Sequence, residues 1–174
     1  MPIEHYREVV LFLLVNIAAV QDLATRRIPN RLLLAGLVGG LLLRLLSPNP
    51  GASLLSALGG MGVGLVMFLP FYLLRGMAAG DVKMMAVVGA FTGPQGAFEV
   101  AVLSWCIGGV MTLLLVLLRG RLRLVLGNLG RMLGGATIPG MGLGDPAGPA
   151  SAGSIPYGPA IALGAIVCLV RQYG

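Results

Sequence analysis

Two aspartates are the residues best suited to chemistry in this sequence. Of its six acidic side chains, only Asp22 and Asp81 fall within or at the ends of apolar stretches on one predicted side of a membrane. An ionisable side chain in a membrane segment is costly and by default indicates a functional site. Two carboxylates a few ångströms apart cannot both ionise easily and share a proton. One can then accept a proton from water while the other donates to a carbonyl oxygen, which is aspartic-protease chemistry.

Each aspartate also has a simpler structural interpretation. Asp22 lies four residues before Arg26, so the two could form a helical ion pair worth a few tenths of a kcal/mol. Asp81 precedes a helical run and could be an N-cap worth about 1 kcal/mol. Neither role would require the two aspartates to lie at the same depth in the membrane.

Other hydrolytic mechanisms lack the residues that they need. The one histidine, His5, is predicted to lie on the opposite side of the membrane, so a Ser-His or Cys-His nucleophile has no base. The HExxH pattern of zinc peptidases is absent. The two cysteines lie in apolar runs without CxxC spacing, which does not predict a metal site. We therefore expect no metal and no cofactor.

The composition predicts which elements must hold these residues. Apolar residues make up 57% of the chain and charged residues only 10%, against about 25% charged in a soluble domain. A chain of 174 residues cannot bury so much apolar surface. The sequence therefore predicts an all-α polytopic protein in a lipid bilayer, with one membrane-embedded domain over residues 1–174. The net charge of +6 is better explained by loops retained in the cytoplasm than by nucleic acid.

Apolar runs separated by Gly and Pro predict six transmembrane helices, since a span needs about 20 residues. Their approximate ranges are 7–25, 30–46, 53–74, 77–93, 97–118 and 155–172. The unbroken apolar part of the fourth span is too short to cross a bilayer. It must begin in the polar segment around Asp81, which places that carboxylate at or below the membrane surface.

Basic residues predict the orientation of these spans. Nine lie on one side: Arg26, Arg27, Arg31, Arg75, Lys83, Arg119, Arg121, Arg123 and Arg131. Three lie on the other: Arg7, Arg44 and Arg171. This bias places the first set and the aspartate pair at the cytoplasmic face, with both termini outside. The long connection, residues 120–154, is rich in Gly and is either a linker or a lid over a site.

Three segments resemble motifs of the type IV prepilin peptidase family, in the family's order. Residues 22–30 (DLATRRIPN) are similar to its first aspartate motif, and residues 80–84 (GDVKM) to its GxGD motif with the following lysine. Residues 155–162 (IPYGPAIA) are similar to its final-span segment. One departure is Ala78, which replaces the first Gly of GxGD. The resemblance covers essentially the whole chain.

The resemblance implies an enzyme that removes the short leader of pilin-like precursors, with Asp22 and Asp81 as the catalytic pair. It implies the inner (cytoplasmic) membrane of a bacterium or archaeon, with the site facing the cytoplasm. Larger members have an N-terminal region with paired cysteines and a methyltransferase activity. This chain begins with the first span, so we expect the short, peptidase-only form found in Flp/Tad pilus systems.

Six further residues are candidates for supporting or substrate-binding roles: Gly80, Lys83, Pro29, Asn30, Arg26 and Tyr157. Gly80 would allow close backbone approach. We expect Pro29 to end the first helix and Asn30 to cap the second. Arg26 and Lys83 could bind an acidic residue of the precursor, although membrane anchoring explains the arginine equally well. Tyr157 is a candidate hydrogen-bond donor near the pair.

Other functions remain open at this point. A small ion- or proton-coupled transporter could use Asp22 and Asp81 as a relay, but it would need acids along the whole path. The outer half offers only Glu99 and the terminal Glu4 and Glu8. A non-catalytic factor for pilus assembly and a protease that cuts within membrane helices are further alternatives. Nothing in the sequence indicates a particular oligomeric state.

Overall fold

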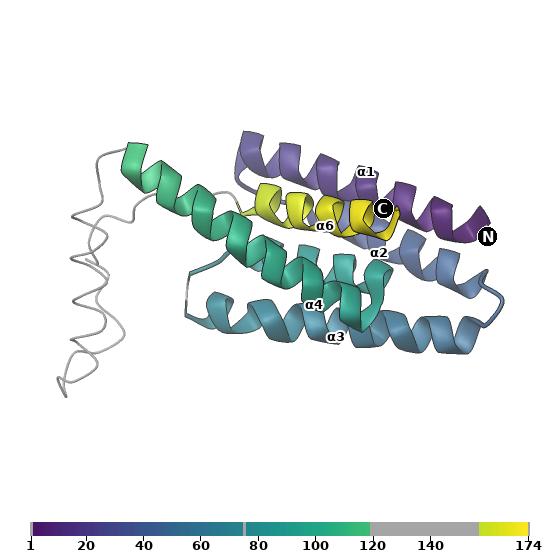
Figure 1. Ribbon diagram of the computed structural model, residues 1–174. Coiled ribbons are helices and arrows are strands. Elements are labelled where there is room, and N and C mark those ends of the chain that lie inside the picture. Colours follow the sequence, from purple (N-terminus) through teal and green to yellow (C-terminus); the bar gives the residue numbers. More distant parts are fainter. Residues whose placement is uncertain (1, 75, 119–156, 174) are drawn as a thin grey trace, which may run out of the picture. The chain divides into compact units, whose positions relative to one another are not determined.

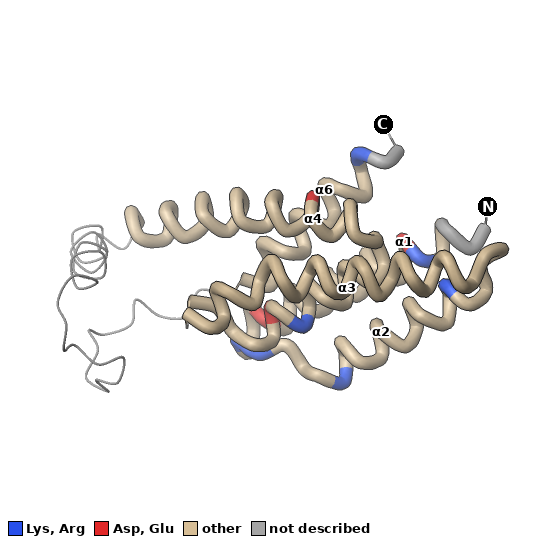
Figure 2. Tube along the Cα trace, turned by 90° about the horizontal axis from the view of Figure 1, so that it is seen from below, with Lys and Arg blue, Asp and Glu red and all other residues tan. Residues whose placement is uncertain are grey.

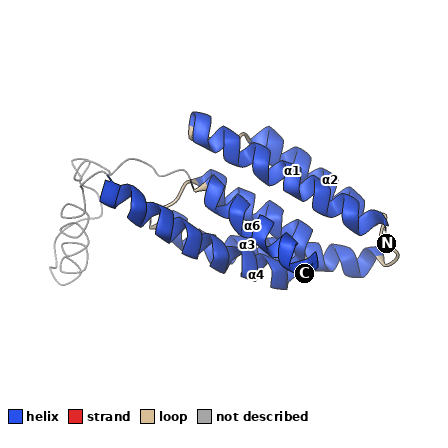
Figure 3. Cartoon of the chain, turned by 45° about the horizontal axis from the view of Figure 1, so that its top comes forward, coloured by secondary structure: helices blue, strands red, loops and turns tan. Residues whose placement is uncertain are grey.

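The computed structural model describes residues 2–74, 76–118 and 157–173. In these ranges the chain forms helices joined by short loops, without a strand (Figure 3). The helices are α1 (Pro2–Thr25), α2 (Asn30–Leu45), α3 (Pro50–Leu73), α4 (Ala79–Leu118) and α6 (Gly158–Tyr173). The all-α prediction is thus confirmed for the described residues. The predicted Gly-rich loop, 120–154, and the first two residues of the predicted sixth span lie outside them.

The loop between α1 and α2 differs from the predicted one. Helix α1 ends at Thr25, and Arg26 has a left-handed φ of 52°, which does not continue a right-handed helix. The helix thus ends four residues before Pro29. The expectation that Asn30 caps α2 is wrong, because Asn30 is the first helical residue. The N-cap position belongs to Pro29, which forms no side-chain capping hydrogen bond.

Helix α4 consists of two arms that meet at Gly93. This glycine has φ 79° and ψ −179°, a conformation that is essentially restricted to glycine. Pro94 follows and has no N–H to donate to a preceding turn. We call residues 79–92 the first arm and residues 94–118 the second arm. The break coincides with the predicted boundary between the fourth and fifth spans, near residues 93–97.

A buried arginine lies at the end of the first arm. Arg44 of α2 is only 4% exposed. Its Nε donates to the carbonyl oxygen of Ala90 at 2.8 Å, and its Nη2 donates to that of Phe91 at 2.9 Å. Its Nη1 donates to the carbonyl oxygen of Ser53 at 2.8 Å. The carbonyl groups of Ala90 and Phe91 belong to the last turn before Gly93, where no following helical N–H groups are available to donate to them. Arg44 therefore satisfies the end of the first arm.

The first arm packs tightly against α3. A Cβ on Gly60 would meet the backbone of Gly89, and one on Gly64 would lie 2.5 Å from the carbonyl oxygen of Met85. The two helices thus touch backbone to backbone. The order of these contacts, with 60 opposite 89 and 64 opposite 85, shows that α3 and the first arm run in opposite directions.

Helix α6 runs antiparallel to the second arm. The Tyr157 hydroxyl donates to the carbonyl oxygen of Ser104 at 3.1 Å, and the Cys168 thiol lies 3.7 Å from the Glu99 carboxylate. Figure 1 shows that α1 and α6 also lie side by side in opposite directions. As a result, the end of α1 and the starts of α2, α4 and α6 lie at one end of the bundle. The ends of α2 and of the first arm lie at the other.

The helices are those of a membrane protein. Three of them, over His5–Thr25, Pro50–Leu73 and Ala79–Leu118, are long and apolar enough to cross a bilayer, and α6 contributes a shorter apolar helix. Large apolar side chains face outward, as at Leu55 and Val66, which are 72% and 68% exposed. Figure 2 shows charged residues mostly toward helix ends, with uncharged stretches between them. Six spans and their orientation stay predictions.

The chain divides into two compact units. One consists of Met1–Gly108 and Pro156–Gly174, and the other of Gly109–Ile155. The core of the first unit contains large buried side chains such as Phe68, Phe91 and Leu11. Both aspartates belong to this unit, and the site described next lies entirely within it.

Candidate active site

Asp22 lies in the last turn of α1 and is only 6% exposed. The backbone N–H of Gly158, the first residue of α6, donates to its Oδ2 at 2.8 Å. The start of a helix presents unpaired N–H groups and the positive end of the helix dipole. The carboxylate of Asp22 is therefore held by the N-terminus of α6, which lies 136 residues away in the sequence.

Gly158 leaves no space for a side chain. A Cβ at this position would lie 2.8 Å from Oδ2 and 2.9 Å from Cβ of Asp22. Such distances are closer than real Cβ atoms approach, and the Asp22 Cβ is attached directly to the backbone of α1, so it cannot easily shift. The absence of a side chain is what allows α6 to reach the carboxylate.

Asp81 lies in the first turn of α4 and is only 4% exposed. Its carboxylate accepts a backbone hydrogen bond from Ala78, the residue before the helix. This is the backward contact that an acidic residue at the third helical position makes in a capping box. The simpler interpretation of Asp81 as an N-cap residue does not hold, because Asp81 is the third residue of α4, although its side chain does satisfy the start of the helix.

The two aspartates lie close enough for the charge of Asp22 to act on Asp81. The charge of Arg26 in turn acts on Asp22. The pair is therefore buried and electrostatically coupled, with Arg26 nearby. Such a pair can hold one ionised and one protonated carboxyl group, which supplies a general base and a general acid at the same site.

Three of the predicted supporting residues, Gly80, Lys83 and Asn30, connect the start of α4 to the α1–α2 loop and the start of α2. Gly80 lies against Ile28 of the α1–α2 loop. A Cβ added to Gly80 would lie 3.4 Å from the Cβ of Ile28. The Nζ of Lys83 donates to Oδ1 of Asn30 at 3.1 Å. Both side chains are exposed. The loop before α2 is thus joined to the first turns of α4, next to Asp81.

Tyr157 differs from its expected role. It lies within electrostatic range of Asp81, but its hydroxyl donates to the carbonyl oxygen of Ser104. Its ring packs against Gly108 and stands edge-on to Phe68, with ring centroids 6.2 Å apart. Tyr157 therefore fixes the start of α6 against the second arm, and α6 supplies the hydrogen bond to Asp22 through the next residue.

Comparison with known protein families gives one match. Residues 9–113, more than half of the chain, match the model of the type IV leader peptidase family. The chain belongs to this family. It is accordingly a peptidase of the membrane and acts on a protein substrate. Comparisons with curated proteins and with solved structures gave no match.

The matched range includes both aspartates of this leader peptidase and ends before the 155–162 segment. The contact between Gly158 and Asp22 connects that segment to the matched part. Among the described residues, no group of three His, Cys, Asp or Glu side chains is placed to hold a metal ion.

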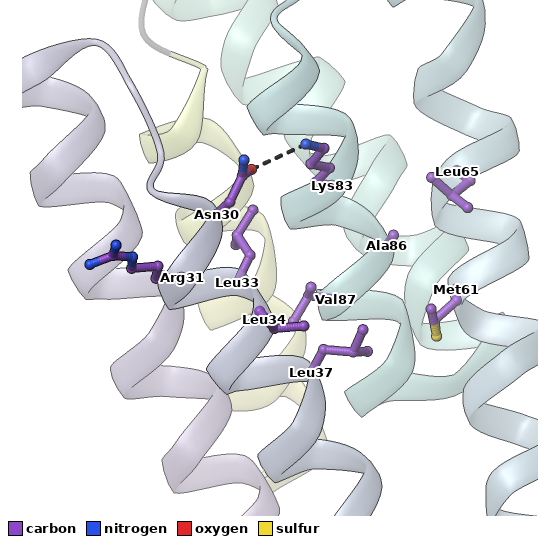
Figure 4. Close-up of a pocket in the computed structure, with 10 residues that line it drawn as sticks. All are labelled: Asn30, Arg31, Leu33, Leu34, Leu37, Met61, Leu65, Lys83, Ala86 and Val87. Carbon is purple, nitrogen blue, oxygen red and sulfur yellow. Dashed lines mark hydrogen bonds between the residues drawn. The ribbon is translucent and has the colours of Figure 1, made fainter.

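The leader peptidase also has a pocket of about 380 Å³ beside the first arm (Figure 4). Its walls are mainly apolar, with Leu34 and Leu37 from α2, Leu65 from α3, and Val87 from the first arm. The Lys83–Asn30 hydrogen bond lies at one end. A volume of this size is within the about 300–1,000 Å³ typical of ligand pockets.

Two features of the leader peptidase were missed by sequence reasoning. Gly158 lies in a segment that resembles a family motif, but its sequence does not show which side chain its N–H contacts. Arg44 was counted among the outer basic residues, whereas it is buried against backbone carbonyls. Every residue has a carbonyl group, so the sequence offers no signal for such partners.

Proposed function

We propose that this leader peptidase is an aspartic endopeptidase that removes the short leader of type IV pilin-like precursors. Asp22 and Asp81 would be its catalytic pair, and the reaction would occur at the cytoplasmic face of a bacterial or archaeal inner membrane. The main support is the burial of the two carboxylates within electrostatic range of each other, although they are 59 positions apart in the sequence. A structural acid needs no such partner.

The reaction follows from one shared proton. The ionised carboxylate takes a proton from water as the water oxygen attacks the scissile carbonyl carbon. The protonated carboxyl group donates its proton to the carbonyl oxygen, which gives a neutral tetrahedral diol. The carbon–nitrogen bond then breaks. One carboxyl group protonates the leaving amine, and the other recovers a proton from the diol, so the pair returns to its starting state with one water consumed.

The surroundings support this chemistry in two ways. The Gly158 N–H holds one oxygen of Asp22 in a fixed direction, and the Ala78 backbone does the same for Asp81. Fixed geometry matters because catalysis requires reacting atoms within about 3–3.5 Å. The cytoplasmic face is favoured by the excess of basic residues in the loops at this end of the predicted spans.

The proposed pair is tested by near-isosteric substitutions. A candidate precursor would be incubated with wild type, Asp22→Asn and Asp81→Asn in detergent, with folding verified for each. We expect both variants to lose cleavage by at least about 10³-fold, since an amide can neither accept nor relay the proton.

Glu99→Gln provides a matched control. Glu99 is a partly buried acid at the opposite end of the bundle, where it contacts Gln95 and Cys168. It is expected to retain cleavage. Full activity in either Asp→Asn variant would refute the mechanism.

A further inference from the structure

The pocket beside the first arm opens to the outside of the bundle. Leu34 and Leu65 at its walls are 62% and 38% exposed. Figure 4 shows it bounded by α2 on one side, α3 on the other and the first arm behind. Since these outer surfaces are apolar, the opening faces the acyl chains in the predicted membrane. An apolar molecule could therefore move in from the bilayer without crossing water.

The two ends of this pocket differ in polarity. Leu37 and Met61 lie at the end of the pocket away from Lys83 and Asn30, which lie at the starts of α4 and α2. From residue 30 to residue 37 a helix rises about 10 Å. The pocket is thus an apolar groove about two helical turns long with a cation at its mouth.

Lys83 has capacity for a further partner. Its ammonium group has three donors, and among the described residues it donates to the neutral amide oxygen of Asn30. Arg31 also lines this part of the groove. The mouth therefore favours a carboxylate or a backbone carbonyl on the molecule that occupies the groove.

The mouth of the groove and Asp81 both belong to the start of the first arm. Lys83 lies two residues after Asp81 on the first arm, and Gly80 contacts Ile28 of the same loop that supplies Asn30. An extended peptide covers about 3.3 Å per residue. Positions two apart in a helix point about 200° away from each other, so a chain that leaves the mouth of the groove would pass around the start of the first arm to reach Asp81.

We propose that this groove binds the apolar, membrane-embedded segment of the precursor that follows the scissile bond. The inference rests on the proposed function and names the surface that selects the substrate. The apolar segment would lie against the Leu34, Leu37 and Val87 side chains. Lys83 would bind a carbonyl or carboxylate group at the membrane surface, which would place the scissile bond beside Asp81.

Filling the groove tests this assignment. Leu34→Trp adds bulk at the opening, and Leu42→Trp places the same side chain two turns further along α2, at a position with similar exposure, 55% against 62%. We expect Leu34→Trp to lower kcat/KM for a full precursor at least about tenfold, mainly through KM. Leu42→Trp should match wild type. The difference should nearly vanish for a short peptide that spans the scissile bond but lacks the apolar segment.

Cross-linking tests the groove without relying on catalysis. A Cys106→Ala, Cys168→Ala, Asp81→Asn background would receive Leu37→Cys, and the precursor would have a single cysteine in its apolar segment. We expect a disulfide with Leu37→Cys and none with Leu42→Cys. If wild type fails to cleave the precursor but the cross-link forms, the proposed peptidase function is refuted, whereas the binding of the apolar segment in the groove is supported.

Other outcomes would overturn the groove assignment itself. Cleavage that depends on both aspartates but is unaffected by Leu34→Trp, together with no cross-link, would show that the precursor does not bind in the groove. If native mass spectrometry then shows a phospholipid retained by wild type and lost from Leu34→Trp, the groove is a lipid site instead.

Discussion

At the scale of single residues, the candidate site depends on backbone groups as much as on side chains. Asp22 is held by the Gly158 N–H, and Asp81 accepts a hydrogen bond from Ala78. Backbone donors are fixed by the helices to which they belong and need no rotamer ordering. The two carboxylates are therefore positioned by the starts of α6 and α4, so small changes at these helix starts should alter catalysis.

Gly158→Ala tests this directly. The added methyl group would meet Oδ2 of Asp22 at 2.8 Å and push the carboxylate away from its place. A displacement of about 1 Å can cost about 10²-fold in rate. We therefore expect kcat for precursor cleavage to fall about 10- to 100-fold with little change in KM.

The control for this substitution is Gly39→Ala, because a Cβ at Gly39 would have nothing within 4 Å. It should cleave at the wild-type rate and gain slightly in stability, by about 0.5–1 kcal/mol. Wild-type kcat in Gly158→Ala would show that the contact with α6 does not position Asp22.

At the scale of helices, the break at Gly93 divides α4 into two arms that are each short enough for one crossing of a bilayer. A straight helix of 40 residues would be about 60 Å long, twice the apolar thickness of a bilayer. The left-handed conformation of Gly93 divides it into two arms. The first arm can then extend from Asp81 at one end to the guanidinium of Arg44 at the other.

Arg44→Met should loosen this arrangement. The substitution removes three hydrogen bonds and leaves the carbonyl oxygens of Ala90, Phe91 and Ser53 without these donors. Each unpaired buried acceptor costs about 1–3 kcal/mol. We expect thermal unfolding in detergent to shift to a clearly lower temperature, by about 5 °C or more.

Arg44→Lys should recover only part of this loss, because a single ammonium group cannot span the three carbonyls. Arg31→Met, at an exposed position of the same helix, is the control and should unfold near the wild-type temperature. An unchanged unfolding temperature in Arg44→Met would mean that these hydrogen bonds contribute little to stability.

At the scale of the whole molecule, the predicted topology places the α2–α3 loop outside the cell and the α3–α4 loop in the cytoplasm. Asn49 lies between α2 and α3, and Gly76 lies between α3 and α4. In a Cys106→Ala, Cys168→Ala background, a membrane-impermeant thiol reagent added outside intact cells should label Asn49→Cys. It should label Gly76→Cys only after the cells are opened. The reverse pattern would invert the orientation and place the aspartates on the outer face.

Much of this arrangement follows from local sequence features. Apolar runs and the positions of Gly and Pro predicted the helices, and Gly93-Pro94 marked the break in α4. The common membrane depth of Asp22 and Asp81, inferred from those runs, stays a prediction. The partners of the aspartates could not be predicted, because the Gly158 contact joins residues 136 positions apart. Asn30 was assigned to helix capping, whereas its side chain bonds to Lys83 from a distant helix.

The buried guanidinium of Arg44 also constrains the order in which the protein is assembled during synthesis. Two of its acceptors, at Ala90 and Phe91, come 46 and 47 residues later in the chain. When α2 and α3 leave the ribosome, those acceptors have not yet been made. At that stage Arg44 is expected to remain hydrated near the end of α2, as long basic side chains do near helix ends. The final seating of α2 therefore waits for the first arm, and a nascent chain stopped before residue 90 would expose this site to quality-control proteases.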